Sequence, residues 1–162
     1  MIVFDPKTSL VLIIAFLNFI LGGFVYLQNQ KEAVNRTFGI MTLLVGLWAI
    51  SAFIFRSVPL NGLSYLFGFV LYDVAALLPT SFLLMTLTFP PYSLFSKKIF
   101  GLLIVETAAV IWAVNTPNLI IKDLILENGE KILIWGRYYF IYVLHLASLF
   151  SIGYFVLLRK FR

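Results

Sequence analysis

Long apolar stretches alternate with short polar connectors along the whole chain. The stretches cover approximately residues 9–28, 38–56, 63–89, 99–115 and 137–158. A helix rises about 1.5 Å per residue, so roughly 20 apolar residues cross a hydrocarbon core of about 30 Å. Pro90 and Pro91 end the third stretch, because neither can continue a helical hydrogen-bond ladder. The pattern predicts an all-α polytopic membrane helix bundle of five transmembrane helices, forming a single transmembrane domain over residues 1–162.

The first stretch is expected to remain in the mature protein rather than to be cleaved as a signal peptide. The segment before it, MIVFDPK, carries one acid and one base instead of a basic region. No A-x-A cleavage motif follows the apolar run. We therefore interpret residues 9–28 as an uncleaved transmembrane helix.

The connector between the fourth and fifth stretches, residues 116–136, is long enough to have structure of its own. Asn128-Gly129 between two apolar runs is typical of a β-hairpin with a type I′ turn. Glu127 and Glu130 would then face each other and weaken the pairing slightly. A short interfacial helix beginning at Thr116-Pro117 could precede the hairpin or replace it. The remaining alternative is a plain external loop.

Composition excludes most soluble functions. Hydrophobic residues make up 62% of the chain and charged residues 12%, against about 45–50% and about 25% in soluble domains. This balance excludes an ordinary soluble enzyme and a nucleic-acid-binding module. There is no cysteine, no P-loop, no G-x-S-x-G and no H-E-x-x-H, and only one histidine. We expect no enzymatic activity, no cofactor and no metal site.

The basic residues predict how the chain is oriented in the membrane. The connectors on one side hold Lys31, Arg36, Lys97, Lys98, Arg159, Lys160 and Arg162. The connectors on the other side hold Lys7, Arg56, Lys122, Lys131 and Arg137. The side with more Lys and Arg is the cytoplasmic one by the positive-inside rule. We expect a multi-pass protein of the cell membrane with its N-terminus outside and its C-terminus in the cytoplasm.

Three ionisable residues interrupt the apolar stretches. Asp73 lies in the third stretch, about halfway across, Glu106 in the fourth and His145 in the fifth. Such residues are costly in hydrocarbon, so each is a functional candidate. Glu106 could pair with Asn18, with Thr107 or with a helix outside this chain. The simpler interpretation is that these groups only hold the helices together.

The fifth stretch carries a polar stripe at helical spacing, formed by Tyr138, Tyr142, His145 and Ser148. If the third and fifth helices pack together, Asp73 could reach His145 or Arg137. The predicted site is an outward-facing pocket that binds a small ligand or senses protons. Its proposed lining residues are Asp73, Tyr138, Tyr142, His145 and Arg137. Imidazole is the side chain that most readily changes charge near neutral pH, which makes His145 the pH-sensitive member.

These residues favour signal perception at the membrane, with a relay to a cytoplasmic output that this chain does not contain. One alternative is a structural or assembly subunit of a larger membrane complex. The least favoured is a small proton-coupled transporter, since the sequence has no internal repeat. The expected partners are the lipid bilayer and either a cytoplasmic kinase or other membrane subunits, and not nucleic acid.

Four segments resemble the N-terminal seven-helix membrane region of histidine kinases. They are NRTFGIMTLLVGLWAISAF, LMTLTFP, NTPNLI and IWGRYYFIYVLHLASLFSIGYFVLLRKFR. The resemblance implies a two-component-system sensor that passes a signal to cytoplasmic PAS, GAF or kinase domains. The chain departs from the family in having five predicted helices instead of seven and no kinase. We therefore expect either a fragment of a longer sensor or a stand-alone relative that needs a partner.

Overall fold

The computed structural model describes residues 6–90, 94, 96–127 and 130–162, and within these ranges it contains five long helices and one hairpin. The helices are α1 (Pro6–Gln28), α2 (Ala33–Ser57), α3 (Gly62–Thr88), α4 (Lys97–Asn115) and α5 (Tyr139–Lys160). The strands are β1 (Ile121–Glu127) and β2 (Glu130–Trp135). All five helices are long and apolar enough to cross a membrane. The prediction of a five-helix polytopic bundle is confirmed.

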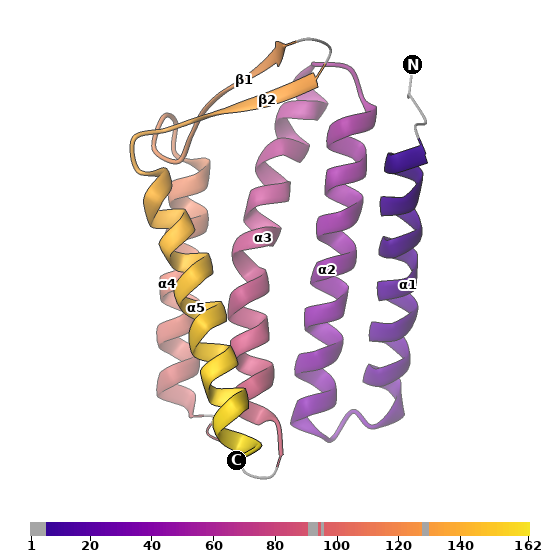
Figure 1. Cartoon of the computed structure of the whole chain (residues 1–162), viewed down its shortest axis with the longest axis vertical. Helices are drawn as coiled ribbons and strands as arrows, with labels where there is room; N and C mark the ends of the chain where they lie inside the picture. The colour runs from indigo at the N-terminus through magenta and orange to yellow at the C-terminus, as the bar shows by residue number, and fades with distance from the viewer. Residues whose placement is uncertain (1–5, 91–93, 95, 128–129) are drawn as a thin grey trace.

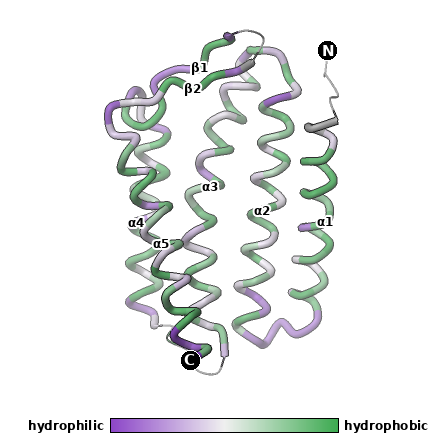
Figure 2. Tube along the Cα trace, in the orientation of Figure 1, coloured by the Kyte–Doolittle hydropathy of each residue, from purple (hydrophilic) through white to green (hydrophobic). Residues whose placement is uncertain are grey.

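The helices form a layer that thickens at one edge (Figure 1). Helices α1, α2 and α3 lie side by side in chain order, and both α4 and α5 pack against α3. The hairpin crosses one end of the bundle, and α5 ends at the other. We call these the hairpin end and the opposite end. Polar residues gather in the connectors at both ends, while the helices between them are predominantly apolar (Figure 2).

Helices α2, α3 and α4 begin before the apolar stretches that predict them. Helix α2 begins at Ala33 rather than at residue 38, so its first turn includes the polar residues Asn35 and Arg36. Asn61 begins α3 with a capping box, in which its side chain accepts from the Ser64 backbone N–H and its own N–H donates to the Ser64 hydroxyl. Ser96 caps α4 by accepting from the Ile99 N–H. Apolar length therefore predicts the central part of each helix, and capping side chains mark where α3 and α4 begin.

Small residues set two of the helix crossings. Helices α1 and α2 approach each other at Gly22 and Gly39, where a Cβ on either glycine would lie 3.2 Å from the other's carbonyl oxygen. Helix α5 approaches α3 at Gly153, where a Cβ would lie 2.6 Å from a ring carbon of Phe82. Close approach of this kind is the usual basis of helix packing in membranes, where lipid removes the hydrophobic driving force between helices.

The connector between α4 and α5 is a β-hairpin, as the sequence predicted. The strands pair antiparallel, with Glu127 opposite Glu130 and an irregularity between Ile121 and Asp123. The expected turn residues, Asn128 and Gly129, lie outside the described residues. The alternative of an interfacial helix at Thr116 is wrong. A single hydrogen-bonded turn forms there instead, in which the Leu119 N–H donates to the Thr116 carbonyl.

The hairpin makes hydrogen bonds or ring contacts with three helices. The hydroxyl of Tyr65 on α3 donates to the Leu124 carbonyl at 2.9 Å. The ammonium of Lys131 donates to the carbonyls of Phe55 and Val58 at the end of α2. Desolvation at this position lowers the pKa of Lys131. Trp135 stacks on Tyr139 at the start of α5, so the hairpin connects α2, α3 and α5 at one end of the bundle.

Candidate functional site

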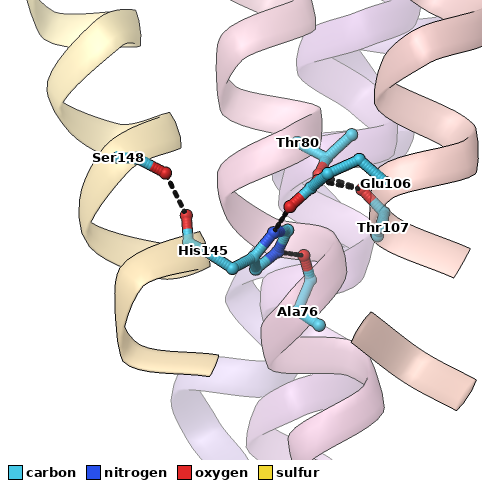
Figure 3. A network of polar contacts seen from close by, with 6 residues as sticks. All are labelled: Ala76, Thr80, Glu106, Thr107, His145 and Ser148. Atoms are coloured by element: carbon cyan, nitrogen blue, oxygen red, sulfur yellow. Dashed lines mark hydrogen bonds and ion pairs between the residues drawn. The ribbon is translucent and has the colours of Figure 1, made fainter. Parts of the chain in front are cut away.

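His145 lies at the centre of a polar network that joins three helices (Figure 3). Its Nδ1 lies 2.6 Å from Oε1 of Glu106 on α4, and its Nε2 lies 2.8 Å from the carbonyl oxygen of Ala76 on α3. The side chain of His145 is 1% exposed. Direct packing between α4 and α5 is sparse, so this contact is a principal link between them.

The two partners of the imidazole determine where its protons lie. The Ala76 carbonyl can only accept, so Nε2 must carry a proton. One further proton lies between Nδ1 and the Glu106 carboxyl group, on either atom. A further proton can be carried by Oε2, which leaves Oε1 able to accept from Nδ1–H. Loss of the shared proton would place two lone pairs face to face. The link between α4 and α5 therefore requires the shared proton to be present.

A hydroxyl pair next to this contact joins α3 to α4. The hydroxyls of Thr80 and Thr107 lie 2.6 Å apart and are buried. Oε2 of Glu106 lies 3.5 Å from the Thr107 hydroxyl, a long contact. The Glu106 side chain is 41% exposed, in contrast to its imidazole partner. One carboxylate oxygen is thus engaged inside the bundle, while the other is near its surface.

The predicted contact between Asp73 and His145 or Arg137 is wrong. Both carboxylate oxygens of Asp73 accept from the Asn115 amide, at 2.8 and 3.0 Å. Asn115 is the last residue of α4, so Asp73 is level with that helix end rather than halfway through the bundle. The reason is the length of α3, whose first turns extend beyond α4 to meet the hairpin.

The polar stripe of α5 divides into a buried and an exposed part. Tyr142 is buried, and its hydroxyl donates to the Tyr72 carbonyl at 3.1 Å. Tyr138 is 38% exposed, and Arg137 lies over its ring at 5.7 Å from the centroid. Ser148 is exposed and donates to the His145 carbonyl of its own helix. Only Tyr142 and His145 therefore face α3.

A small cavity lies elsewhere than the sequence predicted. It measures about 50 Å³ and is located between α3 and the hairpin, and none of the predicted ligand residues lines it. Its lining residues are Tyr65, Gly68, Phe69, Ile121, Lys122, Asp123, Leu124 and Leu133. Within the described ranges, no group of three His, Asp or Glu side chains could hold a metal ion.

Sequence reasoning identified Glu106 and His145 separately but did not pair them. Glu106 was expected to pair with Asn18, with Thr107 or with a helix outside this chain. Of the first two, the structure shows only the long contact with Thr107. Asn18 donates to the Ile14 carbonyl of its own helix. No motif in the sequence marks the carbonyl of Ala76 as an acceptor, because any residue at that position would supply one.

The fold and the buried polar network are those of a polytopic membrane bundle. The model of the N-terminal 7TM region of histidine kinase matches residues 10–162. The chain belongs to this family. No curated protein and no solved structure gives a significant match. The region is the sensing part of a histidine kinase rather than its catalytic part, which implies a protein embedded in a membrane with a linked kinase domain.

Proposed function

We propose that this membrane sensor module perceives its signal at the contact between His145 and Glu106. The observation that carries the proposal is the 2.6 Å contact between Nδ1 and Oε1, which joins two helices that otherwise touch little. Loss of the shared proton removes this hydrogen bond. The α4–α5 pair then separates, while α5 keeps its packing on α3 through Gly153.

A small ligand could produce the same change by competing for either partner. Such a ligand would enter from the hairpin end, where Arg137 and Tyr138 are exposed and Asp73 is half-buried. Tyr142 lies between that entrance and His145, about one helical turn from each along the stripe. A ligand bearing a hydrogen-bond donor would suit the Glu106 carboxylate, and one bearing an acceptor would suit the imidazole.

The relay runs along α5 to the opposite end of the bundle. There Lys160 donates to the carbonyls of Leu87 and Phe89 at the end of α3, at 3.2 and 2.5 Å. Movement of α5 would change this contact and the basic segment around it, which includes Arg159 and Arg162. In the proposed orientation the N-terminus is outside, and this basic segment faces the cytoplasm and a linked kinase domain.

The test uses the single histidine of the chain. Nitrogen-15 labelling of histidine gives one imidazole, whose two nitrogen shifts report tautomer and charge in lipid nanodiscs as the pH is varied. Because the chain has no cysteine, spin labels on Leu102→Cys and Leu144→Cys, both on exposed positions, report the α4–α5 distance. We expect that distance to change at the pH where the histidine signal changes.

Two variants test whether the change depends on the Glu106 carboxylate. Glu106→Gln replaces the carboxylate by an amide, whose N–H can donate to a neutral Nδ1, so the contact should no longer depend on a shared proton. Ser148→Ala is the matched control, because Ser148 is exposed and bonds only within its own helix. A histidine signal that titrates without any change in the α4–α5 distance, or that is the same in Glu106→Gln, would contradict the proposal.

A further inference from the structure

The Oε2 atom of Glu106 lacks a good hydrogen-bond donor within the bundle. Oε1 is engaged by His145, but Oε2 has only the 3.5 Å contact with Thr107. Around it the surface of α4 is apolar, with Leu102 72% exposed and Val105 69% exposed. A carboxylate oxygen facing hydrocarbon without a good donor is costly. This surface therefore favours a neighbour that can donate a hydrogen bond.

Asn18 on α1 presents the complementary group. Its amide nitrogen donates to the Ile14 carbonyl at 2.8 Å, which uses one of two N–H groups. Within the described part of the chain its Oδ1 has no hydrogen-bond partner, and the side chain is partly exposed. The flanking residues Leu17 and Leu21 are exposed and apolar. Asn18 thus lies at the edge of the apolar outer face of α1, next to the side where Ala15 and Gly22 are buried.

The two groups lie at matching heights but cannot meet within one chain. Asn18 is one residue past the middle of α1, since residue 17 is equidistant from Pro6 and Gln28. Glu106 is the middle residue of α4, nine residues from both Lys97 and Asn115. Helices α1 and α4 lie at opposite edges of the bundle (Figure 1).

We propose that Asn18 of one copy donates to Oε2 of Glu106 in a second copy, so that α1 and α4 of adjacent copies pack in the membrane. The contact satisfies an acceptor on one surface with a donor on another at the same depth. It is heterologous, because the two faces differ, so each copy uses one face for each neighbour. The proposal does not rest on the proposed function, which depends on Oε1 and His145.

Disulfide crosslinking tests the geometry directly, since the chain has no thiol of its own. Leu17→Cys and Val105→Cys place one thiol beside each polar group, on copies that carry different tags. We expect crosslinked pairs in lipid vesicles when the two variants are mixed, and none when either is present alone. Leu17→Cys mixed with Tyr154→Cys is the control, because Tyr154 is equally exposed but lies on α5.

Asn18→Leu tests the chemistry. The substitution removes only a bond within α1, so folding should be unaffected. We expect the association constant in detergent to fall roughly three- to twentyfold, as for other hydrogen bonds between membrane helices. The histidine titration should remain unchanged, which separates this contact from the sensing site. Crosslinking of Leu17→Cys with itself, equal crosslinking at the control pair, or unchanged association of Asn18→Leu would overturn the proposal.

Discussion

The contact between His145 and Glu106 makes a quantitative prediction for a double-mutant cycle. Replacing His145 by Leu leaves the Ala76 carbonyl and one carboxylate oxygen without their partner. Replacing Glu106 by Leu leaves Nδ1 of a buried imidazole without its partner. Each polar group left without a partner costs about 1–3 kcal/mol.

The double-mutant cycle separates the free energy of the contact from the free energy gained by placing leucine in hydrocarbon. Leucine is favourable in hydrocarbon, so each single change combines a loss of hydrogen bonding with a favourable transfer term. That transfer term occurs equally in the single and double variants and cancels in the cycle. We expect the double variant to be more stable than additivity predicts, by about 1–2 kcal/mol, near the upper end measured for polar contacts between membrane helices.

The assay is reversible unfolding in mixed micelles, followed by helical circular dichroism as the fraction of denaturing detergent rises. A parallel cycle of Thr107→Val with His145→Leu serves as control, because Thr107 hydrogen-bonds Thr80 and makes no hydrogen bond with the imidazole. If the free energies of unfolding for Glu106→Leu and His145→Leu add within about 0.5 kcal/mol, the pair does not couple α4 to α5. The proposed site would then have no energetic basis.

Three further predictions concern the surrounding structure. Gly153→Val should lower the free energy of unfolding by about 1–3 kcal/mol, because its Cβ would lie 2.6 Å from the Phe82 ring. Gly101→Ala should have little effect in the same assay, because Gly101 faces open space. Lys131→Met should speed amide hydrogen exchange in β2 and in the last turn of α2, because the ammonium donates to two carbonyls at the end of α2. Unchanged exchange would show that other contacts hold the hairpin in place. Asp73→Asn should leave the histidine titration unchanged, because the Asp73 carboxylate accepts from Asn115 at the end of α4 and not from the imidazole. A shifted titration would support the pocket that the sequence predicted between Asp73 and His145.

The five spans and the hairpin could be predicted from the sequence because each depends on local chemistry. A helix that crosses hydrocarbon must be apolar over about 20 residues, since its backbone groups are satisfied within the segment. The hairpin was indicated by a turn dipeptide between two apolar runs, which is also a local signal. His145 and Glu106 were singled out for a similar reason, since an ionisable residue is conspicuous in an apolar stretch.

Which polar groups meet was decided by the tertiary structure alone. In a soluble protein the apolar face of a helix marks the core, but here the surfaces facing lipid and facing other helices are both apolar. Periodicity therefore does not reveal which side of α4 faces α5, nor that Asp73 is level with Asn115. These pairings follow from close approaches at residues such as Gly153 and from the unequal lengths of α3 and α4. Both are properties of how the helices pack, because the height and rotation of one helix are defined only against its neighbours.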